Sequence, residues 1–136
     1  EAPEDFALLQ RTPVPWRFHD ADNDIRSRRP VINLRADGCM DYFVFNAHIA
    51  DIPDMRADDL HRFYPAYRRL MQRIREPSYS VQYRLEPGEL VMFDNTRVLH
   101  SRRAFDPRSG ERHLLGFYLE RNEIDSRIRV LARENR

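Results

Sequence analysis

The clearest helical pattern in the chain runs from Asp58 to Arg75, and it constrains the fold more than any other segment. Its apolar residues recur at the spacings that line one face of an amphipathic helix. They are Leu60, Phe63, Tyr64, Tyr67, Leu70, Met71 and Ile74. Asp58 or Asp59 is predicted to cap the first turn, and Pro77 is predicted to stop the helix. Pro65 falls inside the pattern and predicts a bend or a division into two pieces. We expect the aromatic stripe to form core rather than a cofactor site.

Short strand-like segments surround this helix and give the chain its predicted β-rich character. Each is rich in apolar or aromatic side chains and is bounded by turn residues. They are Trp16–His19, Val31–Leu34, Asp41–Asn46, Tyr79–Leu85, Leu90–Phe93 and Arg112–Leu119. Turns are predicted at Ala36–Gly38 and Glu86–Glu89, and helical stretches at Phe6–Leu9 and Asp125–Arg133. Several strands, one main helix and a late helix predict an α+β, β-rich sheet or barrel.

Length, charge and cysteine content limit the class of protein. The chain has 136 residues, which fit one domain or a large piece of one. Its charged residues nearly cancel to a net charge of +1, so the composition provides no general basic field for nucleic acid. No apolar run approaches the roughly 20 residues that are needed to cross a membrane. The single cysteine, Cys39, excludes an internal disulfide and fits a reducing cytoplasm. We therefore expect a cytoplasmic domain without nucleic-acid or membrane partners.

The last third of the chain presents a histidine and an arginine in a suggestive pattern. An apolar run ends at Phe93, Asp94 and Asn95 form a polar turn, and a second apolar run ends at His100. Arg112 opens the next predicted strand, so neighbouring strands would bring His100 and Arg112 toward one pocket. Taken alone, such a histidine is more often structural or exposed than a ligand. Such an arginine is more often a solvated charge.

One known chemistry uses both residue types together. Non-heme iron(II) oxygenases hold the metal with two histidines and one carboxylate, and they leave positions open for co-substrate and oxygen. The co-substrate 2-oxoglutarate chelates iron through its keto-acid end. Its distal carboxylate suits an arginine, which can donate two parallel hydrogen bonds. His100 and Arg112 fit these two roles.

Three motifs in this part of the chain resemble those of the γ-butyrobetaine and trimethyllysine dioxygenases, a branch of the taurine dioxygenase-like superfamily. They are PGELVMFDNTRVLHSR at 87–102, RHLLGFY at 112–118 and SRIRVL at 126–131. A weaker resemblance covers Thr12–Trp16, Gly38–Asn46 and the helix before Pro77. The resemblance implies that residues 1–136 are the C-terminal part of a single catalytic domain. The fold it implies is a double-stranded β-helix (jelly-roll), incomplete in this chain.

The resemblance also implies roles for four residues. His100 resembles the second iron-binding histidine of the family, and Arg112 resembles the arginine that holds the distal carboxylate of 2-oxoglutarate. Tyr118 matches a tyrosine of an aromatic cage for the trimethylammonium group of the substrate, although a packed sheet residue is an equal alternative. Asn46 matches an asparagine near the substrate. The Asp-Asn turn before His100 is expected to shape the backbone rather than to contact substrate.

The sequence departs from the family pattern in two places. Ser101 follows the metal histidine, where the family usually has glycine. The first metal motif of the family, His-x-Asp, is expected upstream of Glu1, where the chain begins without an initiator methionine. The segment His19–Asp22 has the wrong spacing to replace that motif, so His19 is expected to be structural or exposed. We therefore expect the isolated chain to be inactive.

The function implied by the resemblance is hydroxylation of a small molecule by an Fe(II)- and 2-oxoglutarate-dependent dioxygenase. The favoured substrate is a quaternary-ammonium acid such as γ-butyrobetaine, which would place the protein in carnitine biosynthesis. Molecular oxygen is the second co-substrate, and ascorbate is an additional candidate cofactor. Two alternatives stay open: a sulfonate or phosphonate substrate, and a noncatalytic jelly-roll binding domain that lacks the metal site. Because an incomplete barrel exposes strand edges and apolar surface, a homodimer is a further expectation.

Overall fold

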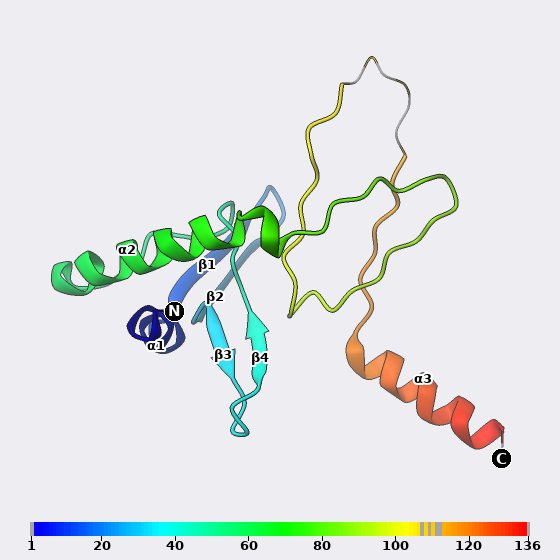
Figure 1. The fold of residues 1–136 in the computed structure, drawn as a ribbon. Coiled ribbons are helices and arrows are strands. Elements are labelled where there is room, and N and C mark those ends of the chain that lie inside the picture. Colours follow the sequence, from blue (N-terminus) through cyan, green and yellow to red (C-terminus); the bar gives the residue numbers. More distant parts are fainter. Residues whose placement is uncertain (1, 107, 109, 111–112, 136) are drawn as a thin grey trace. The chain divides into compact units, whose positions relative to one another are not determined.

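The computed structural model describes residues 2–106, 108, 110 and 113–135. The chain divides into two compact units, Glu1–Ser101 and Arg102–Arg136. In the first unit the elements follow one another as two helices around four short strands, then a single 3-10 turn (Figure 1). They are α1 (Pro3–Arg11), β1 (Val14–His19), β2 (Asp24–Arg29), β3 (Ile32–Leu34), β4 (Met40–Phe43), α2 (Ala57–Ile74) and η1 (Pro77–Tyr79). The second unit contains α3 (Arg121–Glu134).

The four strands form two antiparallel hairpins. Strands β1 and β2 pair from Val14 opposite Arg29 to His19 opposite Asp24. The indole N–H of Trp16 donates a hydrogen bond of 3.1 Å to the carbonyl oxygen of Arg29, which fixes this register from the buried side. The strand β2 was not predicted, because its sequence DIRSRR has no apolar alternation and all six of its residues are exposed. It forms because β1 offers it a complete ladder of backbone partners.

The second hairpin joins β3 to β4, and its turn confirms the prediction at Ala36–Gly38. The amide of Gly38 donates to the carbonyl of Arg35 at 2.9 Å, and the amide of Arg35 donates to the carbonyl of Cys39 at 2.8 Å. Gly38 adopts φ of +78°, a backbone conformation that glycine reaches without the steric cost that other residues meet. The ladder is irregular between Asn33 and Leu34.

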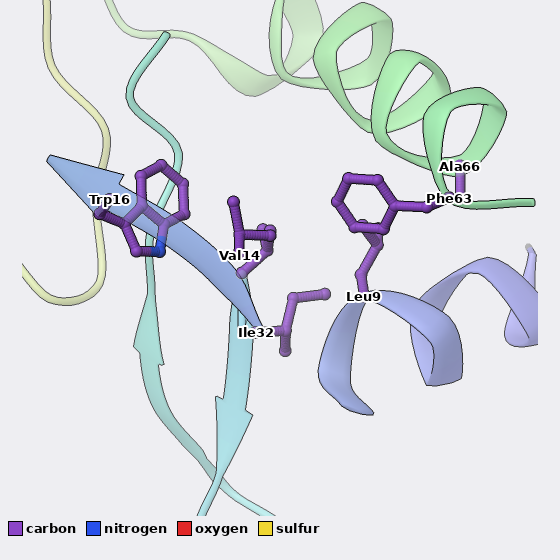
Figure 2. Packing of buried hydrophobic residues seen from close by; sticks show 7 residues of the cluster. Leu9, Val14, Trp16, Ile32, Phe63 and Ala66 are labelled. Carbon is purple, nitrogen blue, oxygen red and sulfur yellow. The ribbon is translucent and has the colours of Figure 1, made fainter. Parts of the chain in front are cut away.

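A small apolar core holds the first unit together. Figure 2 shows Leu9 of α1 and Phe63 of α2 facing one another, with Val14 and Ile32 beside them. The core also contains Trp16, Val31 and Ala66. At the rim of this core the guanidinium of Arg69 donates two hydrogen bonds to the carboxylate of Asp5, at 2.6 and 2.7 Å. This ion pair joins α2 to α1 and lowers the pKa of Asp5.

The helix α2 confirms the main helical prediction and corrects two details of it. It runs without a break through Pro65, so the predicted division is wrong. Its N-cap is Arg56, and no side chain caps it, so neither Asp58 nor Asp59 has the predicted capping role. Both aspartates lie in the first turn, where their charge interacts favourably with the helix dipole. The other two helices contain the predicted stretches Phe6–Leu9 and Asp125–Arg133 and extend beyond them.

The predicted strands after α2 are absent from the described residues. Tyr79 belongs to the 3-10 helix η1, and the described residues from 80 to 119 form no strand. The predicted turn at Glu86–Glu89 is present, because the amide of Glu89 donates to the carbonyl of Glu86 at 3.1 Å. An extended segment becomes a strand only when a neighbouring segment pairs with its backbone N–H and C=O groups. Among the described residues, the predicted strand segments after α2 pair with no such neighbour. The α+β composition is therefore confirmed, whereas the described residues form two small hairpins and no barrel.

Candidate functional site

A tight turn leads to His100. One carboxylate oxygen of Asp94 accepts hydrogen bonds from the backbone N–H of Thr96 at 2.9 Å and from the hydroxyl of Thr96 at 2.6 Å. The carbonyl oxygen of Asp94 accepts a further bond from the amide of Arg97 at 3.0 Å. This arrangement, in which an aspartate side chain bonds to the backbone two residues later, reverses the chain. The Asp-Asn turn therefore shapes the backbone before His100, as predicted.

The turn brings the ring of Phe93 against the imidazole of His100. Their ring centroids lie 4.8 Å apart with planes inclined by 50°. His100 is exposed, and within the described part of the chain neither of its ring nitrogens has a hydrogen-bond partner. An imidazole nitrogen that is free in this way can coordinate a metal.

Asn46 follows β4 in the same unit. Its side-chain oxygen accepts a hydrogen bond from the amide of His48 at 3.0 Å, which leaves the NH₂ group as the part of the amide that can donate to a ligand. The amide of Phe43, three residues earlier, donates to the carbonyl of Thr96 at 2.8 Å. The segment that leads to Asn46 and the turn that leads to His100 are thus tied to one another through the end of β4.

Three stacked aromatic rings lie next to Asn46. Tyr67 of α2 stacks on Phe45 with a centroid separation of 4.8 Å and on Phe63 with a separation of 5.4 Å. Burial raises the pKa of Tyr67, and in the described residues its buried hydroxyl has no hydrogen-bond partner. The stack links the residue before Asn46 to the apolar core.

The described residues do not by themselves make an iron site. They contain no group of three or more histidine, cysteine, aspartate or glutamate side chains that could hold a metal ion. His100 fits the donor chemistry of a single imidazole ligand, because it is exposed and its nitrogens are free within the described chain. Two hollows in the described structure border α2, and neither is lined by His100 or Asn46.

The other two predicted site residues belong to the second unit. Arg112 lies outside the described residues. Tyr118 is described, in a segment without regular structure, and 83% of its surface is exposed. Within the first unit, the structure ties the segments of His100 and Asn46 together.

His19 has the structural place that the sequence predicted. Its Nδ1 lies 3.1 Å from the carbonyl oxygen of Asn23 across the tip of the first hairpin. Close by, the carboxylate of Asp24 bonds to both Arg17 and Arg26, and these guanidinium groups hold the pKa of Asp24 well below its ordinary value. The carboxylate of Asp24, which is the acidic residue of β2, is thus paired with arginines.

Sequence reasoning missed the contact of Phe93 with His100, the bonds of Thr96 to Asp94 and the stacking of Tyr67 on Phe45 and Phe63. The spacing of Asp94 and Thr96 carried a usable signal, because aspartate often bonds to the backbone two residues ahead. The ring contacts of Phe93 and Tyr67 had no such signal, because they depend on the tertiary path of the chain.

The described motifs place the chain in a known family. The model of the family "Taurine catabolism dioxygenase TauD, TfdA family" matches residues 1–118. The chain therefore belongs to the TauD/TfdA dioxygenase family.

Among curated proteins, the chain is similar to γ-butyrobetaine and trimethyllysine dioxygenases. It is 44% identical over 133 residues to the γ-butyrobetaine dioxygenase of Pseudomonas sp. (strain AK-1), an alignment that covers 98% of this chain and 35% of that protein. It is 32% identical over 138 residues to the mitochondrial trimethyllysine dioxygenase of Bos taurus, covering 97% of this chain and 32% of the relative. It is 29% identical over 134 residues to the γ-butyrobetaine dioxygenase of Homo sapiens, covering 95% and 35% respectively.

The chain thus spans about a third of the length of the relatives that it matches, and the resemblance to their C-terminal part is confirmed. Among the helices that the structure describes, none has the length and apolar character of a membrane span.

Proposed function

We propose that this chain is the C-terminal part of the catalytic domain of an Fe(II)- and 2-oxoglutarate-dependent dioxygenase with a jelly-roll fold. Its substrate is a small quaternary-ammonium acid such as γ-butyrobetaine. The observation that carries the proposal is the 44% identity to a γ-butyrobetaine dioxygenase across nearly the whole chain. The exposed imidazole of His100 at the end of the Asp94 turn supports it.

Each proposed site residue has one task. His100 donates an imidazole nitrogen to the iron, and Arg112 holds the distal carboxylate of 2-oxoglutarate through paired hydrogen bonds. When bound, the iron and its co-substrate supply the oxidising power for hydroxylation of a C–H bond by O₂. The remaining ligands, a histidine and a carboxylate, come from a His-x-Asp motif outside this chain.

The substrate is proposed to bind through its two ends. Asn46 is exposed and its side-chain oxygen accepts the amide of His48, so its NH₂ group can donate to an acceptor on the substrate. The ring of Tyr118 is exposed and can attract a trimethylammonium group, whose methyl groups offer no hydrogen-bond donor. A sulfonate or phosphonate substrate would need no aromatic cage, so the effect of Tyr118 separates the two substrate classes.

Turnover measurements test the proposal. Protein at its native length is expected to consume 2-oxoglutarate in the presence of γ-butyrobetaine, and His100→Ala and Arg112→Ala are expected to abolish this consumption. Tyr118→Leu is expected to raise KM for γ-butyrobetaine while the affinity for 2-oxoglutarate stays the same. Turnover by the isolated 136-residue chain would contradict the proposed division of ligands. A native-length protein that binds γ-butyrobetaine but consumes no 2-oxoglutarate would favour the noncatalytic alternative.

The remaining proposals concern location and assembly. A cytoplasmic location fits the single exposed cysteine, Cys39. We propose a homodimer because many apolar side chains after α2 are exposed, with Val81 at 89% and Met92 at 74%. Sedimentation of the native-length protein tests this assembly.

A further inference from the structure

The imidazole of His100, the proposed iron ligand, lies against the ring of Phe93. A metal-ligating histidine commonly donates its second ring N–H to a carboxylate, a backbone carbonyl or water, and that bond fixes the direction of the ring. Within the described residues, neither nitrogen of His100 has such a partner.

The contact with Phe93 can supply that orientation. The ring centroids lie 4.8 Å apart with planes inclined by 50°, a tilted arrangement at the close end of the distances at which aromatic rings attract one another. Rotation of the imidazole about its bond to the chain would break this contact. Phe93 thus restricts the ring without occupying a nitrogen that could bind the metal.

The contact exists because the Asp94 turn folds residues 93 and 100 toward one another. Two hydrogen bonds from Thr96 to one carboxylate oxygen of Asp94 close the turn, and the shorter of them, at 2.6 Å, comes from the hydroxyl. A hydroxyl that donates to a carboxylate at this distance makes one of the stronger types of hydrogen bond in proteins. The hydroxyl of Thr96 therefore contributes directly to the path of the chain between Phe93 and His100.

The turn is also fixed to the folded part of the first unit. The carbonyl of Thr96 accepts the 2.8 Å bond from the amide of Phe43, the last residue of β4. Strand β4 pairs with β3, where Ile32 is buried in the apolar core. The turn before His100 is thus bonded to a strand of the second hairpin, and that hairpin packs in the core through Ile32.

We propose that Phe93 and the Asp94–Thr96 turn are positioning residues that orient the imidazole of His100 for metal binding. The inference rests on the proposed function, because it takes His100 as an iron ligand. It adds that the ring contact with Phe93 and the hydroxyl of Thr96 fix the direction of the imidazole. Loss of either is expected to lower iron affinity by about 10-fold or more, as for other residues that orient metal ligands.

The test compares Thr96→Val with Thr96→Ser, and Phe93→Leu with the parent, in the protein at its native length. Thr96→Val keeps the shape of the side chain but removes the hydroxyl, whereas Thr96→Ser keeps the hydroxyl. The matched control is Asp37→Ala, because Asp37 forms a similar turn by accepting the amide of Cys39 at 2.8 Å, but in the β3–β4 hairpin. Anaerobic titration with Fe(II) measures affinity, and chemical denaturation of each metal-free variant measures its folding.

Weaker iron binding in Thr96→Val and Phe93→Leu, with normal affinity in Thr96→Ser and Asp37→Ala, is the expected result. Normal affinity in both Thr96→Val and Phe93→Leu would overturn the proposal, and so would an equal loss in Thr96→Ser. A second readout uses the metal-free protein: the NMR signals of the His100 ring are expected to shift when the neighbouring ring of Phe93 is removed. If the parent protein binds no iron, the proposed function fails. The NMR signals of Phe93→Leu and Thr96→Val, each compared with the parent, then still decide whether Phe93 lies against the His100 ring and whether that contact depends on the hydroxyl of Thr96.

Discussion

Two regions of the molecule differ in how they use their apolar residues. In the packed region, residues 3–74, Phe63 is only 2% exposed and lies in a core that α1, β1, β3 and α2 share. In the extended region, residues 80–119, Val81 is 89% exposed and the described residues form no strand. Both regions carry apolar side chains at strand or helix spacing. The difference is that the packed region contains its own packing partners within the same stretch of chain.

The two regions also differ in which of the proposed site residues they contain. His100 and Tyr118 belong to the extended region, while Asn46 follows the second hairpin of the packed region. The hydrogen bond from the amide of Phe43 to the carbonyl of Thr96 links the two regions, because it joins β4 to the turn before His100.

Truncation of an apolar side chain should give the largest difference in stability between the two regions. Phe63→Ala is expected to lower the free energy of unfolding by about 3–5 kcal/mol, because it removes a buried ring and leaves a cavity. Val81→Ala is expected to change it by less than about 0.5 kcal/mol, because the side chain is exposed. Urea denaturation of the chain measures both. Equal losses in the two variants would show that Val81 is buried in solution, which would break the comparison.

Replacement of glycine by alanine should give a smaller difference in stability between the two regions. Gly38 of the β3–β4 turn has φ of +78°, so Gly38→Ala is expected to lower the free energy of unfolding by about 1–2 kcal/mol through steric strain. Gly116 of the extended region does not have this conformation, and an added Cβ there would meet no atom within 4 Å. Gly116→Ala is therefore the matched control and should change stability by less than about 0.5 kcal/mol. A cost at Gly116 as large as at Gly38 would contradict the structure of the extended region.

Removal of the unpaired hydroxyl of Tyr67 should raise stability slightly. Tyr67→Phe keeps the stack with Phe45 and Phe63 and removes a buried polar atom without a described partner, so a gain of up to about 1 kcal/mol is expected. Burial raises the pKa of Tyr67 above its ordinary value of 10.0, so the neutral form is favoured in the folded state and stability is lost as the pH rises above that value.

Tyr67→Phe should remove that alkaline loss, and the exposed Tyr64 provides a control through Tyr64→Phe. Thermal unfolding at neutral and alkaline pH measures both effects. A marked loss of stability in Tyr67→Phe would mean that the hydroxyl has a hydrogen-bond partner after all.

The smallest effect concerns the ion pair between α1 and α2. Because Arg69 lowers the pKa of Asp5 in the folded state, the pair stabilises the fold at pH values above the unfolded pKa of about 4. That contribution is lost as the pH falls through the lower folded pKa. Arg69→Gln should therefore flatten the acid side of the stability curve, and Arg68→Gln, at an exposed neighbouring position, should leave it unchanged. Identical curves for Arg69→Gln and the parent would show that the pair contributes nothing, as many surface pairs do.

Sequence reasoning predicted the packed region well because its signals are local. The spacing of apolar residues predicted α2, and the residues Ala36–Gly38 predicted the hairpin turn between β3 and β4. Strand β2 was missed because its exposed, charged sequence carries no periodic signal, and its formation depends on β1. Pro65 was expected to bend α2 or to divide it, and the helix is not divided, while Phe63 and Ala66 on either side of Pro65 are buried in the core.

The candidate site was predictable only in part. Resemblance pointed to His100, Arg112, Tyr118 and Asn46, and the turn at Asp94 has the predicted shape. Strands at Leu90–Phe93 and after Arg112 did not form among the described residues, because a strand requires a pairing partner that local sequence does not specify. For the same reason, the ring contact between Phe93 and His100 could not be predicted from spacing.

Anaerobic titration with Fe(II) and 2-oxoglutarate tests the central claim most directly, because the chelate of iron with this keto acid has a visible charge-transfer band. The protein at its native length is expected to develop the band, and His100→Ala is expected to lose it. The isolated 136-residue chain is expected to show no band, because His100 is the one iron ligand that it is proposed to supply. A band in the isolated chain, or an unchanged band in His100→Ala at native length, would contradict the proposed role of His100.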